Sequence, residues 1–454
     1  MAYSTIIEMA ETSEDLARRV VAILKRHAHQ GYLVGGCVRD MLLHRVPEDF
    51  DVATDAVPAR VLELFPRGQL VGAHFGVVLI VEGPAQVEVA TFRRDHAYLD
   101  GRRPERVEFE TAPRQDVLRR DFTINALLMD AESGEILDFV GGRADLERGL
   151  LRAIGDPDAR FGEDHLRMLR AVRFAARFGF EIEPATFEAI EKLHALILRV
   201  SSERVRDELI RILTEGGART GFQLLDRSGL LQAILPEVAA MKGVEQPPQF
   251  HPEGDVWIHT LLMLEAMRSP TASLALGVLL HDVGKPPTFR VEDRIRFDGH
   301  AETGAQMAVE ILTRLRASGE LTARVEALVA NHLRFKDVER MRESTLKRFL
   351  RMEHFDEHLE LHRLDCVASH RRLEHYQFVR AKLEEYSAEI LKPPPLITGR
   401  DLIEAGYRPG PPFAAMLQAV EDAQLEGRIG TRAEALAWVA SLFKRPKPES
   451  YNGL

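Results

Sequence analysis

The sequence has little cysteine and no long hydrophobic run. Its 454 residues include only two cysteines, Cys37 and Cys366. Their wide separation argues against a disulfide-stapled scaffold and fits a reducing compartment. Apolar runs such as LALGVLL at 274–280 are far shorter than the ~20 residues that cross a bilayer. The first residues also lack the basic-then-apolar pattern of a signal peptide. We therefore expect a cytoplasmic protein with no membrane partner.

The sequence also lacks an overall excess of basic charge, which many nucleic-acid-binding proteins have. Its 60 Lys and Arg stand against 70 Asp and Glu, for a formal net charge of −10. Phosphate backbones are bound by Lys and Arg, so this balance argues mildly against a nucleic-acid partner. Basic residues nevertheless cluster locally, because segment 160–177 carries five arginines against two acids. Net charge therefore decides little here.

The chain changes character near residue 150. Before that point, short strand patterns at 31–34, 50–54, 75–81 and 86–92 alternate with helical patterns such as 57–65. After it, amphipathic helical patterns run to the C-terminus, separated by Pro- and Gly-rich segments. The sequence predicts a fold with an α/β head, a small mixed sheet with helices, followed by an all-α body. A length of 454 residues fits two to four domains.

A glycine turn links the first strand to a helix. Residues 34–40 read VGGCVRD, in which Gly35 and Gly36 follow a strand and Arg39 lies in the first helical turn. Glycines let the backbone approach a phosphate closely, and a helix N-terminus offers free N–H groups. The structural alternative is a plain strand–turn–helix corner, because a Gly-Gly pair alone is weak evidence.

Two carboxylates follow this turn closely. Asp49 and Asp51 are two positions apart around Phe50, so on a strand their side chains share one face. Paired carboxylates suit Mg²⁺, which prefers oxygen ligands and bridges to substrate phosphates. Two carboxylates in this arrangement, with no other motif nearby, usually lie on a solvated edge strand. Beside a phosphate turn, it predicts a phosphoryl-transfer site.

These motifs together resemble the class II tRNA nucleotidyltransferases and bacterial poly(A) polymerases of the polymerase-beta superfamily. Segments 87–104, 119–130 and 155–180 extend the resemblance over roughly the first 215 residues. The resemblance implies that Gly36, Arg39, Arg120 and Asn125 contact the nucleotide, and that Asp49 and Asp51 hold the catalytic Mg²⁺. Glu88 is a candidate third acid, with an exposed strand residue or a salt-bridge partner as the structural alternative.

A helix is expected to open at Glu163, directly after Gly162, with an apolar back and an arginine front. A solvated basic face is the structural alternative. The resemblance implies instead that Asp164 and Arg167 read the base and that Arg170 and Arg173 support the base or the phosphates. A carboxylate accepts from the amino group of cytosine or adenine, and a guanidinium donates to the ring nitrogen. The resemblance also implies that segment 93–119 contains a flexible loop that the family needs for the final A, and its retention favours full CCA or A addition over CC-only addition.

The helical half carries histidines and aspartates in a recurring order. This order resembles the HD phosphohydrolase superfamily, which implies a site for a divalent metal of unknown identity. Lys285 could contact a substrate phosphate there. The implied ligands are His259, His281, Asp282, His300, His332 and Asp365.

The change of pattern near residue 150, the Pro-rich segments 242–255 and 391–399 and the resemblance together predict four domains. They are a head (1–150), a base-reading and RNA-binding neck (151–245), an HD domain (246–390) and a helical tail (391–454). The predicted function is CCA addition to tRNA from CTP and ATP. The alternatives are an A-adding enzyme, a poly(A) polymerase, an HD phosphohydrolase with a nucleotide-binding head, and a non-catalytic RNA-binding protein. The sequence leaves the oligomeric state open.

Overall fold

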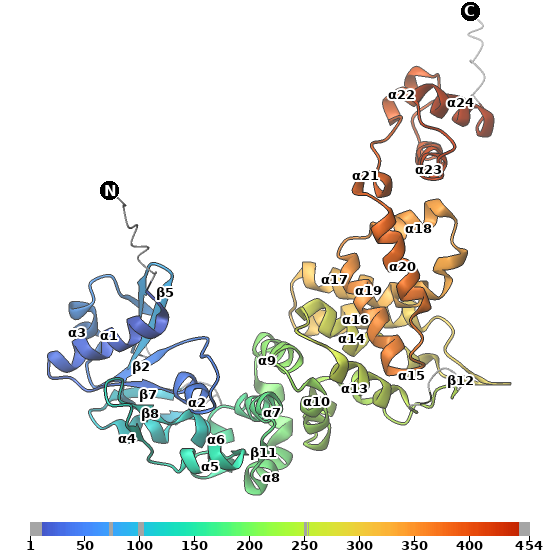
Figure 1. Cartoon of the computed structure of the whole chain (residues 1–454). Coiled ribbons are helices and arrows are strands. Elements are labelled where there is room, and N and C mark those ends of the chain that lie inside the picture. The colour runs from blue at the N-terminus through green and yellow to red at the C-terminus, as the bar shows by residue number, and fades with distance from the viewer. Residues whose placement is uncertain (1–10, 72–75, 99–103, 249–251, 253, 445–454) are drawn as a thin grey trace, which may run out of the picture. The chain divides into compact units, whose positions relative to one another are not determined.

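The computed structural model describes residues 11–71, 76–98, 104–248, 252 and 254–444. The chain forms two compact units (Figure 1). The N-terminal unit comprises Met1–Ala240 together with Ile311–Ala317, and the C-terminal unit comprises Met241–Glu310 and Ser318–Leu454. The four finer domain boundaries expected from the sequence stay predictions.

A seven-stranded mixed sheet forms the core of the head, as the sequence predicts. Its strand order is β3-β4-β5-β2-β1-β8-β9, and β2 and β5 are the parallel pair. Register aligns Leu33, Val52, Val89 and Val78, all fully buried, in one apolar row across four strands. The strands are β1 (Gly31–Val34), β2 (Asp51–Thr54), β3 (Gln69–Val71), β4 (Val77–Glu82), β5 (Ala85–Thr91), β8 (Leu128–Met129) and β9 (Ile136–Leu137).

Helices cover this sheet and connect its strands. Helix α1 packs against β1, β2 and β5, and a capping box of Thr12 and Asp15 fixes its start. Helix α3 confirms the helical pattern expected at 57–65. The head helices are α1 (Ser13–Arg26), α2 (Gly36–Leu42), α3 (Pro58–Leu64), α4 (Pro113–Leu118), η1 (Thr123–Asn125) and α5 (Gly142–Arg148).

The segment expected as a flexible loop has regular structure over its described part. Strands β6 (Arg93–Tyr98) and β7 (Pro104–Phe109) form an antiparallel hairpin, and α4 follows it. Residues 99–103 lie outside the described residues.

The rest of the N-terminal unit is helical apart from one two-residue ladder, β10 (Leu150–Leu151) with β11 (Glu181–Ile182). Helix α7 packs against both α9 and α10. The helices are α6 (Pro157–Glu163), α7 (Arg167–Phe178), α8 (Pro184–Leu193), η2 (His194–Arg199), α9 (Ser202–Thr214), α10 (Ala218–Arg227), α11 (Leu230–Ile234) and α12 (Pro236–Ala239).

The prediction that a helix opens at Glu163 was wrong. Asp156 caps α6 and Pro157 takes its first position, so that helix starts earlier and includes Gly162. Glu163 is its last residue, because Asp164 adopts an extended conformation (φ −140°, ψ 105°). Asp164 therefore lies in the corner between α6 and α7, where no helix fixes the direction of its side chain.

The C-terminal unit confirms the predicted mostly helical architecture, with one short ladder of β12 (Arg290–Val291) and β13 (Ile295–Arg296). Its last three helices enclose an apolar core of their own, which includes Leu402, Val420 and Ala435. The helices are α13 (Val256–Ala266), α14 (Ala272–Leu280), α15 (Lys285–Thr288), α16 (His300–Arg314), α17 (Gly319–Asn331), η3 (His332–Arg340), α18 (Glu343–Leu350), α19 (Phe355–Ala368), α20 (Glu374–Glu385), α21 (Ala388–Leu391), α22 (Gly399–Glu404), α23 (Pro412–Leu425) and α24 (Arg432–Leu442).

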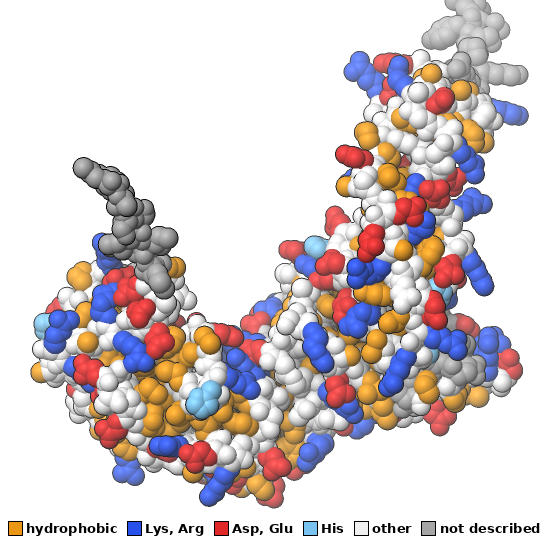
Figure 2. Space-filling view, in the orientation of Figure 1, with side chains coloured by type: hydrophobic (Ala, Val, Ile, Leu, Met, Phe, Trp, Pro, Cys, Tyr) orange, Lys and Arg blue, Asp and Glu red, His pale blue; other side chains and the backbone are white. Residues whose placement is uncertain are grey.

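Surface charge over the last helices is mixed. In Figure 2, Lys and Arg side chains alternate with Asp and Glu side chains on the visible face of the region from α18 to α24. Within the described part of the chain, no helix has both the length and the apolar character to cross a bilayer.

Candidate functional sites

The glycine turn of the head is built around Gly35. Its φ of +76° and ψ of −126° lie in a region that essentially only glycine adopts. A Cβ at this position would lie 3.3 Å from Nη1 of Arg120. Arg120 is held by Asp116, whose carboxylate accepts from it at 3.0 Å. The turn thus brings Arg120 against the start of α2, whereas Gly36 is simply the first residue of that helix.

The predicted carboxylates lie beside this turn. Register pairs Val34, which precedes Gly35, with Asp51, and pairs Asp51 with Glu88 on the other side. Asp49 is exposed and lies in the loop just before β2 rather than on the strand. Burial and the charge of Glu88 raise the pKa of Asp51 to about 6. This crowding of negative charge fits a cation.

Arg39 and Asn125 belong to a buried network. Nη1 of Arg39 donates to Oδ1 of Asn125 at 2.7 Å, and Nδ2 of Asn125 donates to Oδ1 of Asp121 at 3.2 Å. The Arg39 guanidinium also lies 4.6 Å from the ring centroid of Phe178. Only 4% of Arg39 and 7% of Asn125 are exposed. Their hydrogen bonds therefore position the α2 corner, and their predicted nucleotide contacts stay predictions.

The arginines of α7 are paired rather than solvated. Arg170 donates to Oδ2 of Asp121 through Nε and Nη2, at 2.9 and 2.7 Å. Arg173 is buried and donates to Glu208 at 2.7 Å and to Glu215 at 3.0 Å. Burial by itself would raise the pKa of Asp121, but the charge and hydrogen bonds of Arg170 lower it to about 2. The arginines of α7 therefore form ion pairs, and the solvated basic face that was the structural alternative does not form.

Asp164 and Arg167 are each held by partners from other segments. Nη1 of Arg167 donates to Glu163 at 2.6 Å, and its Nη2 donates to the carbonyl of Arg119 at 3.0 Å. Oδ2 of Asp164 accepts from Nη2 of Arg204 at 2.8 Å. The two predicted base-reading side chains thus lie at one helix corner with fixed orientations.

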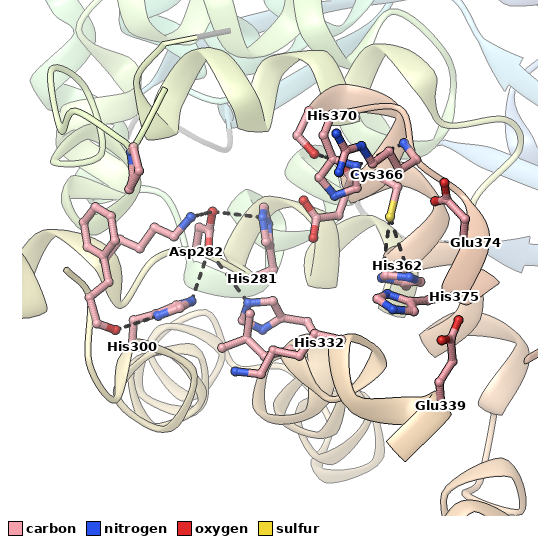
Figure 3. A pocket seen from close by; sticks show the side chains of 18 residues that line it. His281, Asp282, His300, His332, Glu339, His362, Cys366, His370, Glu374 and His375 are labelled. Atoms are coloured by element: carbon pink, nitrogen blue, oxygen red, sulfur yellow. Dashed lines mark hydrogen bonds and ion pairs between the residues drawn. The ribbon is translucent and has the colours of Figure 1, made fainter. Parts of the chain in front are cut away.

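The six predicted HD residues converge in the C-terminal unit. They fall into two groups whose ligand atoms lie within 4.8 Å of one another: His259, His281 and Asp365, and Asp282, His300 and His332. Figure 3 shows His281, His300 and His332 arranged around Asp282. Each sits on or at the end of a helix, so the helix packing sets the ligand geometry.

Backbone carbonyls orient three of these imidazoles. Nδ1 of His281 lies 2.8 Å from the Val278 carbonyl, that of His300 lies 2.8 Å from Phe297, and that of His332 lies 2.7 Å from Val329. An N–H donated from Nδ1 leaves Nε2 as the metal-binding atom. Both oxygens of Asp282 and the Nε2 atoms of His281 and His300 are buried, and none of them has a hydrogen-bond partner among the described residues. Buried ligand atoms of this kind fit a divalent metal.

Electrostatics at this cluster also fit a metal. Burial lowers the pKa of His332 to about 4, so its imidazole is neutral near pH 7, the form that ligates. Burial would raise the pKa of Asp282, but the charges of His281 and Lys285 hold it well below its usual value. Lys285 is buried, lies 2.6 Å from Asp282 and also lines the cavity in front of the cluster, and its predicted contact with a substrate phosphate stays a prediction.

The cluster opens into a cavity of about 820 Å³. Basic and acidic side chains, among them Lys336, Arg372 and Glu339, line it beyond the metal-binding groups. This volume falls in the range of small-molecule and nucleotide sites. His362 belongs to neither group of potential metal ligands among the described residues, and its ring is stacked on Phe335 with 4.4 Å between the ring centroids.

Sequence reasoning missed the residues that hold the predicted site in place. Asp121 lies in segment 119–130, which carries part of the family resemblance, but its pairing with Arg170 depends on the fold. Arg204, Glu208 and Glu215 come from α9 and its end, and their sequence shows only an ordinary amphipathic helix. Their one signal is that Glu208 is a charged residue on the apolar face of that helix, where only 5% of it is exposed.

Three protein families match successive parts of the chain. Residues 31–152 match the poly A polymerase head domain, and residues 256–367 match the HD domain. Between them, residues 179–242 match a family described as "Probable RNA and SrmB- binding site of polymerase A".

Curated relatives and solved structures agree with these matches. The CCA-adding enzyme of Bacillus pumilus is 46% identical over 194 residues, covering 43% of this chain and 48% of the relative. That of Lactiplantibacillus plantarum is 38% identical over 261 residues, covering 57% and 64%. This chain thus spans about half of the first relative and under two thirds of the second. The Bacillus stearothermophilus CCA-adding enzyme in complex with CTP superposes with a TM-score of 0.74 at 26% identity, covering 95% of this chain and 98% of that one.

Proposed function

We propose that this chain belongs to the family of nucleotidyltransferases that contains CCA-adding enzymes and bacterial poly(A) polymerases, and that it adds CMP and AMP to the 3′ end of tRNA. Its substrates are CTP and ATP, and no nucleic-acid template is used. The observation that carries the proposal is the register that puts Asp51 and Glu88 side by side next to the Gly35 turn.

In this reaction the 3′-hydroxyl of the RNA attacks the α-phosphate of the nucleotide, and pyrophosphate leaves. Asp49 and Asp51 would hold Mg²⁺, which supplies activation of the attacking oxygen and charge neutralisation of the leaving group. Arg120, held against the Gly35 turn, would contact the triphosphate. Gly36 lies at the same turn. The buried side chains of Arg39 and Asn125 support this turn through the hydrogen bond between them.

Base selection falls to Asp164 and Arg167. The carboxylate accepts from the exocyclic amino group of cytosine or adenine, and the guanidinium donates to the adjacent ring nitrogen. Uracil and guanine present a carbonyl oxygen to the carboxylate, so acceptor faces acceptor. Arg170 and Arg173, anchored by Asp121 and Glu208, hold the helix behind these two side chains.

The test is incorporation by purified protein into tRNA ending before CCA, after C and after CC. With CTP, ATP and Mg²⁺, we expect CCA on the first substrate and a stop after the final A. AMP added only to the CC-ended tRNA would make this an A-adding enzyme, and a long A tail would make it a poly(A) polymerase. Binding of tRNA without any incorporation would leave only an RNA-binding protein.

Two variants assign this activity to the head. Removing a metal-binding carboxylate costs several kcal/mol of transition-state stabilisation, so Asp49→Asn and Asp51→Asn should each lose at least about a hundredfold in rate. Glu48→Gln is the matched control, because Glu48 is an exposed neighbour of Asp49. Full activity of Asp51→Asn would contradict the proposal.

We propose a second activity, hydrolysis of phosphate esters, for the HD cluster of the C-terminal unit. It is favoured by the buried Nε2 atoms that converge on Asp282 and by the cavity in front of them. His259, His281, Asp282, His300, His332 and Asp365 would hold one or two divalent metals, which supply an activated water. If this were the main activity of the chain, the head would act only as a nucleotide-binding module.

A further inference from the structure

Asp164 is oriented by a residue that lies far from it in sequence. Arg204, on α9, donates from Nη2 to Oδ2 of Asp164 at 2.8 Å. Oδ1 of Asp164 accepts from the backbone N–H of Leu166 at 3.1 Å. The side chains of Arg204 and Asp164 are 25% and 18% exposed, so the pair is largely shielded from water. Each carboxylate oxygen therefore has one fixed partner.

This pairing leaves the carboxylate able to accept more hydrogen bonds. A carboxylate offers about four lone-pair sites, and Leu166 and Arg204 use two of them. Because Asp164 lies in the corner between α6 and α7, helix geometry does not fix its direction. Arg204 is the side chain whose hydrogen bond does so. Without it, the carboxylate could rotate away from the amino group it is to read.

Arg204 also has an unused donor. Its Nη1 is buried and makes no hydrogen bond to any described residue. Leaving a buried guanidinium nitrogen without an acceptor is unfavourable, so native proteins rarely do so unless a ligand or water supplies the acceptor. The nitrogen belongs to the same guanidinium that holds Asp164, which makes a bound nucleotide the natural source of that acceptor.

We propose that Arg204 is a specificity-determining positioning residue, which holds the Asp164 carboxylate toward the amino group of cytosine or adenine and reserves its second terminal nitrogen for the nucleotide. This inference rests on the proposed nucleotidyltransferase function. It assigns to α9 a direct part in choosing the nucleotide, in addition to its packing against α7.

The experiment compares wild type with Arg204→Gln and Arg204→Lys for incorporation of CMP against UMP and of AMP against GMP. We expect Arg204→Gln to lower each kcat/KM ratio by about tenfold or more, since one hydrogen bond that fixes a charged group is lost. Lysine keeps the charge but offers a single donor point, so Arg204→Lys should be intermediate. Arg211→Gln, on the exposed face of the same helix, is the matched control and should leave both ratios unchanged.

A double-mutant cycle distinguishes positioning from a general packing role. If Arg204 acts through Asp164, the Arg204→Gln change should have little further effect on the ratios in an Asp164→Asn background. Equilibrium binding of CTP and UTP without tRNA gives a second measure that needs no catalysis. An active wild type whose ratios are unchanged in Arg204→Gln would overturn the role of Arg204. A wild type that binds CTP over UTP but incorporates nothing would overturn the proposed function alone.

Discussion

Asp121 connects the head to α7 through a single buried carboxylate. It accepts from the backbone N–H of Phe122 and from Asn125 at one oxygen, and from Arg170 at the other. A carboxylate with this many donors stays ionised far below its usual pH range. The predicted site residues Asn125 and Arg170 therefore depend on a residue that was not itself among the predicted ligands.

This carboxylate should make stability depend on acid pH. Its folded pKa of about 2 lies below the usual 3.8, so its contribution is full above pH 4 and is lost as pH falls toward 2. Asp121→Asn should lower the free energy of unfolding at pH 7 by about 2 kcal/mol. Urea titrations between pH 7 and pH 3 would measure the difference, which should narrow in the most acidic samples.

The control for that titration is Asp207→Asn. Asp207 lies on α9 with its side chain 58% exposed, so its removal should change stability by less than about 0.5 kcal/mol. A loss of stability in Asp121→Asn that is constant from pH 7 to pH 3 would mean that the charge of Asp121 is not what stabilises the fold.

The turn before α2 shows how one element depends on one backbone conformation. Sequence pattern identified a Gly-Gly turn but gave no reason to separate its two glycines. In the structure, Gly35 alone takes the positive φ, and Gly36 has the room and the helical conformation that other residues tolerate. The conformational demand of the turn therefore falls on Gly35.

Gly35→Ala should strain this turn. A side chain at φ +76° and ψ −126° costs about 1–3 kcal/mol, and its Cβ would press on Arg120. We expect lower stability and a higher KM for CTP, measured by thermal unfolding and by steady-state incorporation. Gly162→Ala is the matched control, because a Cβ there meets nothing within 4 Å and Gly162 is helical. Equal effects of the two changes would refute the backbone argument.

At the scale of the whole molecule, the two candidate sites lie in different compact units and share no residue. Helix α19 contributes Asp365 to one unit, while α7 and α9 serve the other. Inactivating one site should therefore leave the activity of the other site unchanged. This expectation separates the two proposed activities, which the sequence could only place on one chain.

Asp282→Asn is the change that tests this independence. It removes the carboxylate on which three imidazoles converge, so the bound divalent metal, measured by elemental analysis, and the phosphoesterase activity should both be lost. Incorporation of CMP and AMP into tRNA should stay within about twofold of wild type, since the head is untouched. Asp49→Asn should give the converse pattern. Loss of incorporation in Asp282→Asn would show that the two sites are coupled.

The sequence by itself determined most of the secondary structure and the identity of the candidate metal ligands. Strand positions at 31–34 and 86–92, the helix at 57–65 and the mostly helical second half follow from local periodicity, which the structure confirms. The candidate metal ligands His281 and Asp282 could be identified because the order of the histidines and aspartates along the chain is visible in the sequence itself. Local pattern suffices where a residue's role depends on its immediate neighbours.

Only the tertiary structure decided the rest. It corrected the helix start at Glu163, because the backbone is extended at Asp164 and the next helix, α7, begins only at Arg167. It converted the arginine face of α7 into buried ion pairs with Glu208 and Asp121, and it brought Arg204 to Asp164 across 40 positions. Such partners are joined by packing between helices, and no periodicity within a single helix encodes them.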